Sequence, residues 1–356
     1  MNKSMLDLYT DYLISSFGPT TATGLSRLVD GEVSHDQVTR FLASEAKTSA
    51  DLWRIVKPLI RQVENPEGVL IFDDSIEEKP YTDENDLICW HWDHSNQRHV
   101  KGINFVTAFY VTETLSLPVA FDLVTKTEVY TDAKTGKPKR RSTLTKNARF
   151  RMLLQICVHN QIEFSYVLSD SWYSSSENMN FIKGDLKKDF VMPLKENRKV
   201  ALSEADLQAG RYVSVSTLDL PEGETRLIWL EDVAFPLLLA KQVFTNEDGS
   251  RGTLYLVTSD LTLTYDRMTS LYQKRFGVEG YHKSLKQNAS LEKSPTRTET
   301  TQQNHFFASV CAYVKLERLK MKQGINHFAL KSKIYLSALK SAYAELVKLE
   351  PQSLTA

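Results

Sequence analysis

Carboxylates stand at three places in the chain where a fold could bring them together. Asp73 and Asp74 end an apolar run, GVLIFDD, and Asp170 ends a second one, FSYVLSD. Glu279 lies further on, within a stretch of helical pattern. Carboxylate oxygens are the ligands that hard divalent cations prefer, and three carboxylates can hold two Mg²⁺ ions about 3.5–4 Å apart. These acids therefore predict a metal-dependent displacement at a phosphodiester, in which one ion activates the attacking oxygen and the other stabilises the leaving oxygen.

A second group of polar residues lies along LYQKRFGVEGYHKSLKQN, residues 271–288. Its members follow one another at intervals of three or four residues, so on one continuous helix they share a face. They are Tyr272, Arg275, Glu279, Lys283 and Lys286. Apolar residues take the opposite face, which predicts packing on that side. The alternative is an ordinary solvated helix whose Arg275 and Glu279 pair at i, i+4.

The segments around the first acids predict a sheet. Apolar, strand-like runs occupy residues 68–74, 103–112 and 115–125, an amphipathic helix follows at 146–160, and a buried strand follows at 164–170. The basic stretch before the helix, residues 132–145, has the composition of a linker. The order βββαβ, with acids ending the first and fourth strands, is that of an α/β ribonuclease-H-like fold. A later helix carrying an acid would complete this fold, and Glu279 supplies that acid.

The element patterns predict five parts. Residues 1–66 form a helical domain, residues 67–186 and 263–323 form the two parts of the ribonuclease-H-like core, residues 187–262 form a β-rich insertion, and residues 324–356 form a C-terminal helical region. Within the first part, a short helix around residues 23–29 and a second helix opened by Ser34 suggest a helix-turn-helix that binds DNA. A plain helical bundle is the alternative.

Charge is balanced overall but segregated along the chain. The sequence has 44 Lys and Arg against 44 Asp and Glu. Residues 63–93 hold ten acidic residues and one basic residue, whereas residues 264–340 hold fourteen basic and five acidic residues. A basic half beside an acidic pocket suits a polyanion held near bound cations. The alternative is that these charges are the solvated faces of unrelated elements.

Cysteine spacing, hydropathy and missing motifs exclude several classes of protein. Cys89, Cys157 and Cys311 lie far apart with no CxxC spacing, so neither a zinc site nor a disulfide framework is indicated. No apolar run is long enough for a signal peptide or a membrane span, and we expect a cytoplasmic protein. GxSxG, Walker A and GxGxxG motifs are absent, which argues against a serine hydrolase, a P-loop NTPase and a dinucleotide-binding enzyme.

The spacing of the helical residues is similar to the YREK signature of bacterial insertion-sequence transposases. In this signature Tyr, Arg, Glu and Lys are separated by two, three and six residues, and Tyr272, Arg275, Glu279 and Lys286 match it without a gap. DDS at 73–75 and DSWY at 170–173 resemble the two other acidic motifs of the group. KGINFV at 101–106 and LKQNASLEKSPTRTET at 285–300 also resemble its segments, so the resemblance covers most of the chain.

This resemblance implies a cut-and-paste DNA transposase that uses two Mg²⁺ ions, for which Mn²⁺ can substitute. The implied catalytic and metal-binding residues are Asp74, Asp170 and Glu279. The doublet Asp73-Asp74 leaves the first ligand ambiguous, because successive strand residues point to opposite faces. The residue directly before a hydroxyl-bearing residue matches the pattern of the group, and on that ground we predict Asp74. The implied partners are the terminal inverted repeats and target DNA, bound by a homodimer at the bacterial nucleoid.

The resemblance also implies DNA contacts outside the acids. Tyr272, Arg275 and Lys286 would grip phosphates near the cut, and we add Lys283 and Arg297 as further DNA-binding residues. A hairpin at the transposon end would need an unstacked base held by an aromatic side chain, and Trp229 is the candidate. The alternative for Trp229 is an ordinary sheet-face or core residue. Trp172 is expected to pack against the fold.

Two other functions remain alternatives. A ribonuclease-H-like nuclease could use the same acids to cut DNA without joining it, although the YREK helix argues against this function. A non-catalytic, transposase-derived DNA-binding protein would need no acids, and the presence of all three argues against it.

Overall fold

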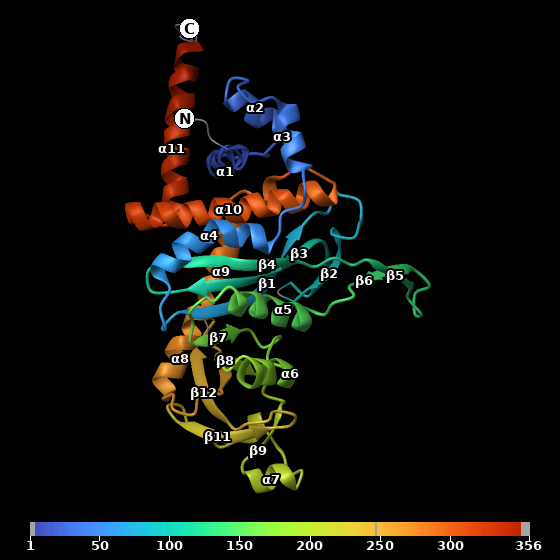
Figure 1. Cartoon of the computed structure of the whole chain (residues 1–356), viewed down its shortest axis with the longest axis vertical. Coiled ribbons are helices and arrows are strands. Elements are labelled where there is room, and N and C mark those ends of the chain that lie inside the picture. The colour runs from blue at the N-terminus through green and yellow to red at the C-terminus, as the bar shows by residue number, and fades with distance from the viewer. Residues whose placement is uncertain (1–3, 95, 246–247, 350–356) are drawn as a thin grey trace.

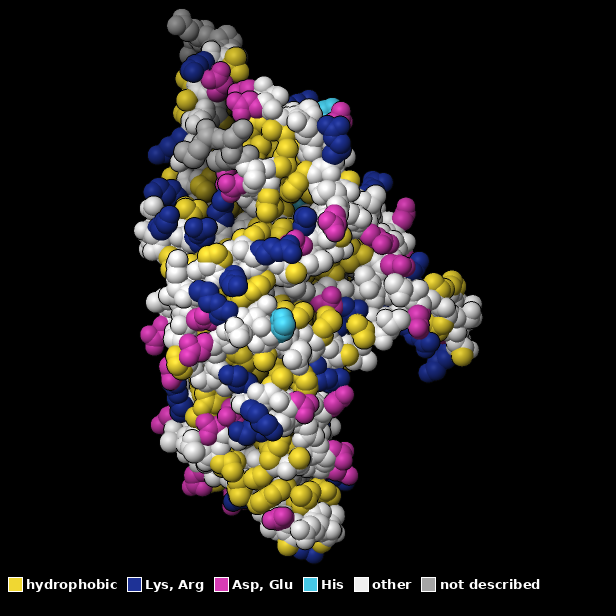
Figure 2. Space-filling view, in the orientation of Figure 1, with side chains coloured by type: hydrophobic (Ala, Val, Ile, Leu, Met, Phe, Trp, Pro, Cys, Tyr) yellow, Lys and Arg dark blue, Asp and Glu magenta, His cyan; other side chains and the backbone are white. Residues whose placement is uncertain are grey.

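The computed structural model describes residues 4–94, 96–245 and 248–349 and is built around one long sheet (Figure 1). Helices from the two ends of the chain lie together at one end of the molecule, and the strands after residue 189 lie at the other end. Among these residues, no helix combines the length and the apolar character that crossing a bilayer requires. Acidic and basic side chains are interspersed over the face shown in Figure 2, so their segregation along the sequence produces no single basic patch on this face.

The N-terminal part is helical, as predicted. The second and third helices match the two short helices expected from the sequence, and Ser34 caps the later one, where its hydroxyl accepts from the Gln37 amide at 3.2 Å. The Gln37 side chain in turn accepts from the Ser34 amide at 2.8 Å, which completes a capping box. The helices are α1 (Met5–Ser15), α2 (Ala22–Leu28), α3 (His35–Leu42) and α4 (Ser49–Val63).

The central strands have the order β4-β3-β1-β7-β8. The first three are antiparallel neighbours, β7 is parallel to β1, and β8 is parallel to β7. With α5 crossing between β4 and β7, this is the ribonuclease-H-like arrangement, which confirms the predicted fold class. The elements are β1 (Val69–Glu78), β3 (Arg98–Val111), β4 (Ser116–Leu123), α5 (Lys146–His159), β7 (Tyr166–Ser169), α6 (Ser176–Asn180), the π-helical turn η1 (Phe181–Asp185) and β8 (Asp189–Leu194).

Two details of this region differ from the prediction. β1 continues past the acidic doublet to Glu78 because β3 pairs with it as far as Gly102, so the doublet lies within the strand. The basic stretch predicted as a linker contributes to a hairpin of β5 (Glu128–Thr131) and β6 (Pro138–Arg141), which projects from the body (Figure 1). An ion pair of 2.7 Å between Arg141 and Glu128 joins its two strands. A short strand that the sequence did not suggest, β2 (Cys89–Asp93), pairs with the first half of β3.

The segment predicted as a β-rich insertion extends the same sheet. Its first strand, β8, is the fifth strand of the central set, and β13 pairs antiparallel with it. From there the sheet continues through β12, β11 and β9 to β10. Within this segment, the run RYVSVSTL at 211–218 forms only the two residues of β10 and a 3₁₀ turn. The elements are β9 (Lys199–Ala201), α7 (Glu204–Gln208), β10 (Val213–Ser214), η2 (Val215–Thr217), β11 (Thr225–Leu230), β12 (Leu237–Thr245) and β13 (Arg251–Thr258).

The C-terminal part is again helical. The continuous helix considered over residues 271–288 is interrupted by a 3₁₀ turn, and the last helix extends away from the body (Figure 1). The elements are α8 (Tyr265–Gln273), η3 (Lys274–Phe276), α9 (Gly277–Gln287), η4 (Leu291–Lys293), α10 (Glu299–Gln323) and α11 (His327–Leu349).

Different helices cover the two faces of the central sheet. On one face, Tyr281 of α9 stacks on Phe109 of β3 with ring centroids 4.8 Å apart. On the other face, Phe150 of α5 meets Phe72 of β1 at 4.6 Å. All four side chains are fully buried. A residue of β1 therefore points either to α9 or to α5, according to its place in the strand alternation.

A buried histidine joins the N-terminal helices to α10. His305 Nδ1 lies 3.0 Å from the Tyr9 hydroxyl, and its Nε2 lies 3.2 Å from the carbonyl oxygens of Ser290 and Leu291. Burial lowers the pKa of His305 to about 4, so the ring is neutral in the folded state. Below its ordinary pKa near 6.5, the unfolded chain gains a proton that the folded chain does not.

We therefore expect the contribution of His305 to the free energy of unfolding to shrink as pH falls from about 6.5 to 4, by at most about 3 kcal/mol. The measurement is urea denaturation of wild type and His305→Gln at several pH values. The stability advantage of wild type over the variant should be largest at pH 7 and should decrease on acidification. An advantage that stays constant across this range would contradict a neutral, buried His305.

Candidate active site

A cavity of about 640 Å³ contains the three predicted carboxylates. Asp74 comes from β1, Asp170 from the residue after β7, and Glu279 from α9. Of the predicted DNA-binding residues, Arg275 and Lys286 also line this cavity. The fold thus brings together groups that lie more than two hundred residues apart in the sequence.

Asp74 points toward α5. It lies two residues after Phe72, whose ring contacts α5, and its carboxylate has three partners. Lys146 Nζ lies 2.7 Å from Oδ2, the Asn104 amide donates to the same oxygen at 2.9 Å, and the Tyr173 hydroxyl donates to Oδ1 at 2.9 Å. Burial opposes ionisation of Asp74, but Lys146 and the two hydrogen-bond donors outweigh burial and lower its pKa. Both oxygens of the Asp74 carboxylate are therefore already bonded to neighbouring side chains.

Asp73 points to the opposite face, toward α9. It pairs with Thr107, two residues along from the pair of Ile71 and Phe109, and Phe109 stacks on α9. Its Oδ2 lies 4.0 Å from Nη1 of Arg275, the residue that leads into α9. Burial, followed by repulsion from Asp170 and Asp74, raises the pKa of Asp73 to about 7. The alternation that the sequence predicted is confirmed, and Asp73 is the member of the doublet on the face of the helix that carries Glu279.

Asp170 follows β7, directly beside β1. Its Oδ1 accepts a hydrogen bond of 3.0 Å from the Trp172 amide, which fixes the carboxylate at the strand end. Burial and repulsion from Asp74 raise the pKa of Asp170, although Arg275 opposes this shift. Asp73, Asp74 and Asp170 thus form a cluster of largely buried carboxylates in which Asp170 and Asp74 both raise the pKa of Asp73, and Asp74 raises that of Asp170.

The helix that carries Glu279 differs from the predicted continuous helix. The 3₁₀ turn η3 separates Tyr272 on α8 from Glu279 on α9, so the five polar residues do not share one regular face. Tyr272 is 5% exposed, and burial raises the pKa of its hydroxyl. Arg275 Nη2 lies 2.8 Å from Glu279 Oε1, and its guanidinium lies 4.5 Å from the ring centre of Phe276. This cation–π contact accounts for an aromatic residue on the polar side of the helix.

Four predicted DNA-binding residues do not line the cavity. Tyr272 packs its ring against the Arg275 guanidinium. Lys283 is exposed, and its ammonium lies 5.4 Å from the ring centre of Phe328. Arg297 is exposed in the loop before α10. Trp229 pairs with Ala201 on β11, and β12, β13, β8 and β7 separate that strand from β1 in the sheet. Lys286 does line the cavity, and its ammonium donates to the Ile76 carbonyl oxygen at 2.8 Å.

Several cavity residues were missed by sequence reasoning. The principal ones are Lys146, Lys195, Trp92, His94 and Trp172, whereas Asp73, which also lines the cavity, was the alternative that the acidic doublet left open. Lys146 opens the helix after the basic stretch, and Trp172 lies inside the DSWY motif, so both positions offered a signal. For Lys195 and Trp92 we find no sequence signal that separates them from other surface residues.

The carboxylate set fits a hard divalent cation in its chemistry. Repulsion from neighbouring carboxylates raises the pKa of both Asp73 and Asp170, which a cation would offset, and their oxygens are suitable donors. Over the described residues, no three His, Cys, Asp or Glu side chains are arranged to hold one ion. The Glu279 carboxylate is bonded to Arg275 instead, and its side chain is 58% exposed. Glu279 thus lines the same cavity as the aspartates while its carboxylate is paired with Arg275.

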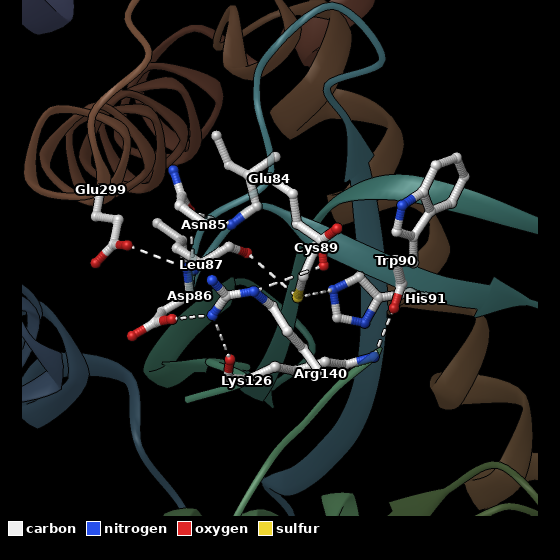
Figure 3. Close-up of polar contacts among 11 residues, drawn as sticks. Glu84, Asn85, Asp86, Leu87, Cys89, Trp90, His91, Lys126, Arg140 and Glu299 are labelled. Carbon is white, nitrogen blue, oxygen red and sulfur yellow. Dashed lines mark hydrogen bonds and ion pairs between the residues drawn. The ribbon is translucent and has the colours of Figure 1, made fainter. Parts of the chain in front are cut away.

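A buried thiol–imidazole pair lies near the cavity but offers no nucleophile. Figure 3 shows the His91 ring turned toward Cys89, with Nε2 3.3 Å from the sulfur. Burial raises the pKa of the Cys89 thiol to about 11 and lowers the pKa of His91 to about 3, so both groups are neutral near pH 7. A thiol nucleophile acts as the thiolate, so this pair is structural. In the same view Arg140 reaches Glu84 and Asp86, which fastens the base of the β5–β6 hairpin.

Comparison with known proteins gives a family match over more than half of the chain. Residues 2–213 match a protein-family model described as DDE superfamily endonuclease. This match includes Asp73, Asp74 and Asp170 and ends before Glu279. A comparison with curated proteins gave no match.

Two solved structures show weak likeness. One is the strand transfer complex of the Drosophila P element transposase, with 11% identity and a TM-score of 0.27 over 51% of this chain and 36% of that chain. The other is the Argonaute of Kluyveromyces polysporus with a guide RNA, with 11% identity and a TM-score of 0.20 over 72% of this chain and 28% of that chain. The chain spans about a third of the length of these solved chains. Likeness at these TM-scores carries no argument about function.

Proposed function

The chain belongs to the DDE superfamily endonucleases, and from that premise we propose that it is a DNA transposase that cuts transposon ends and joins them to target DNA. One observation carries this proposal: acids from two adjacent strands and from a later helix line one cavity together with Arg275 and Lys286. The acids suit metal ions and the cations suit phosphates, so the cavity has the charges that a phosphodiester at a cut site needs. We propose a homodimer as the acting form, in the bacterial cytoplasm on nucleoid DNA.

We propose that Asp73, Asp170 and Glu279 hold the metal, with Asp74 as a positioning residue. The sequence prediction of Asp74 as the first ligand competes with this assignment. Asp73 is favoured because it points to the face of the sheet that α9 covers, and its Oδ2 lies 4.0 Å from Arg275, too far for a hydrogen bond. Both oxygens of Asp74, in contrast, are bonded to Lys146, Asn104 and Tyr173. Bound Mg²⁺, or Mn²⁺ in its place, would activate the attacking water or 3′-hydroxyl and stabilise the leaving oxygen.

The remaining residues have roles in binding and orientation. Arg275 lies between Asp73 and Glu279, so it can release Glu279 and turn to a phosphate when DNA enters. Lys286 lines the same cavity, and Lys283 and Arg297 are exposed and accessible to a longer stretch of DNA backbone. We propose that α2 and α3 bind the transposon end as a helix-turn-helix. Phosphate contacts of this kind make DNA binding depend on salt.

The direct test is cleavage of labelled DNA that carries the sequences flanking the gene. We expect wild type to cut at the ends with Mg²⁺ or Mn²⁺, to yield joined products with target DNA, and to become inactive, while still binding DNA, when EDTA removes the metal. Cutting without joining would favour a nuclease. Binding without cutting under all metal conditions would favour a non-catalytic DNA-binding protein and would overturn the proposal.

A further inference from the structure

Residues 126–141, which we call the arm, project from the body as the β5–β6 hairpin (Figure 1). All eight strand residues are exposed or half-buried, and none contributes to the hydrophobic core. A two-stranded hairpin is at best marginally stable on its own in water. The arm therefore adds little to the packing of the fold, and its surface is free to contact an external partner.

The arm is basic, although the charge of the whole chain is zero. Residues 126–141 hold six Lys or Arg and two acidic residues, so their formal charge is +4 and that of the remaining chain is −4. Lys and Arg side chains are visible on the projection in Figure 2. A positively charged projection from an otherwise acidic protein fits a polyanion.

The two acidic residues of the arm are paired with cations of the same hairpin. Lys139 Nζ lies 2.6 Å from Asp132 Oδ2, and Arg141 Nε lies 2.7 Å from Glu128 Oε2. Arg140 is paired with acids at the base of the arm. These pairs neutralise one another, so the excess positive charge belongs to the remaining lysines of the arm.

Two of these lysines lie in the turn between the strands. Lys134 and Lys137 are exposed, and within the described ranges neither ammonium takes part in an ion pair or a hydrogen bond. Asp132 Oδ1 orders the turn by accepting from the amide and the hydroxyl of Thr135, both at 2.8 Å. Gly136 supplies the left-handed backbone of the turn, with φ of 64°. The two free ammonium groups therefore lie on a preformed turn.

Both ends of the arm are fastened beside the cavity that holds the acids. Lys126 Nζ donates to the Trp90 carbonyl oxygen at 2.5 Å, on the strand β2 that forms part of the cavity wall. At the other end, Ser142 Oγ accepts from Arg149 at 3.0 Å, and the chain continues to Lys146, which lines the cavity. One helical turn of DNA spans about 34–36 Å, whereas four strand residues span about 13 Å. A duplex with one phosphodiester in the cavity is therefore long enough to lie along the arm.

We propose that the arm binds the backbone of the DNA duplex next to the phosphodiester held in the cavity, with Lys134 and Lys137 on its phosphates. This proposal rests on the proposed function for DNA as the ligand. A two-stranded ribbon is narrow enough to enter the major groove, and phosphate contacts hold DNA without reading its sequence. The arm thus adds a sequence-independent contact outside the cavity.

The test measures the affinity for a duplex of about 40 base pairs at several salt concentrations, in EDTA so that no cleavage contributes. The variant is Lys134→Gln combined with Lys137→Gln. At about 0.1 M salt we expect it to bind on the order of ten- to a hundredfold more weakly than wild type. The slope of log affinity against log salt should become shallower by about 1.8, because each phosphate contact contributes about 0.9.

The chain offers a matched control that changes the net charge by the same amount. Lys333 and Lys340 are exposed on α11 and do not line the cavity. Lys333→Gln combined with Lys340→Gln should keep the affinity and the salt slope of wild type. Lys134→Arg combined with Lys137→Arg keeps both charges of the arm and should also bind as wild type does. Thermal unfolding of each variant confirms that it is folded.

The proposal is overturned if the Lys134 and Lys137 variant keeps the affinity and slope of wild type, or if the α11 control loses as much. Unchanged DNA binding with weaker self-association in sedimentation would assign the arm to a second copy of the chain instead. Failure of the proposed function gives a different result. A shallower slope in a protein that never cuts the flanking DNA would support the arm and remove the transposase assignment. Cutting at the ends with an unchanged slope would remove the arm and leave the transposase assignment in place.

Discussion

Asp170→Asn and Glu279→Gln are each expected to bind DNA much as wild type does and to cut it on the order of 10³-fold more slowly. Both carboxylates line the cavity, and in the proposed mechanism each supplies oxygen to the metal. Metal ions contribute several kcal/mol to stabilising the charge that develops at a phosphodiester, and each 1.36 kcal/mol changes the rate about tenfold. Loss of one ligand should therefore remove most of the cleavage rate without removing the cations that hold DNA.

Single-turnover cleavage and DNA affinity, measured on the same preparations, check this expectation. Glu177→Gln is the matched control, because the Glu177 side chain is 71% exposed, pairs with Arg151 and does not line the cavity. That variant should cut at the wild-type rate. Persistent cutting in either cavity variant would show that the acids have been assigned wrongly.

Asp73→Asn and Asp74→Asn are expected to fail in different ways. Asp73→Asn should lose Mn²⁺ binding and cleavage yet stay at least as stable as wild type in EDTA, because it removes a buried charge that repels Asp170. Asp74→Asn should retain measurable Mn²⁺ binding and lose stability, on the order of 1.5–3 kcal/mol, because Lys146 would lose its charged partner.

Calorimetric titration with Mn²⁺ and urea denaturation in EDTA separate these two outcomes. Lys146→Gln combined with Asp74→Asn should recover part of the lost stability, since neither partner is then left charged beside a neutral group. The opposite pattern, with Mn²⁺ binding lost in Asp74→Asn and kept in Asp73→Asn, would restore the sequence prediction of Asp74 as the ligand.

The sequence was sufficient to predict the type and order of the central strands and of the helix between them. Continuous apolar runs predicted β1, β3, β4 and β7, and the 3.6-residue pattern predicted α5, because burial on both faces or on one stripe leaves those signatures. Ser34 marked the start of α3, where the structure shows it capping the helix. Positions that depend on local hydrogen bonding and burial were therefore predictable.

The choice within the acidic doublet was not predictable, for a physical reason. Alternation in a strand says that Asp73 and Asp74 face opposite ways, but it does not say which face a helix two hundred residues later will cover. That information lies in contacts such as Phe109 with Tyr281 and Phe72 with Phe150. The 3₁₀ turn before Gly277 was missed because an ideal helix was assumed for an apolar pattern that a broken helix also satisfies.

The positions of the tryptophans relative to the cavity were likewise not predictable from the sequence. The sequence made Trp229 the candidate for stacking and left Trp172 as a packing residue, and only tertiary placement shows Trp172 half exposed at the cavity. Strand β2, which carries Trp92, is five residues long and gave no distinct pattern. Its place is fixed by pairing with β3, which local sequence does not encode.

The path of the chain between the second and third acids has a consequence for folding. After Asp170 the chain leaves through β8, runs out to the far edge of the sheet at β10 and returns through β12 and β13 before Glu279 is reached. Contacts between residues so distant along the chain give the site a high contact order, and such contacts form late because a long loop must close first. A nascent chain in which only the first two hundred residues have folded would have Asp73 and Asp170 but would lack Glu279, so it would have no catalytic centre. The ability to cut DNA would therefore arise only after β8 to β13 have paired into the sheet and α9 has brought Glu279 to the cavity.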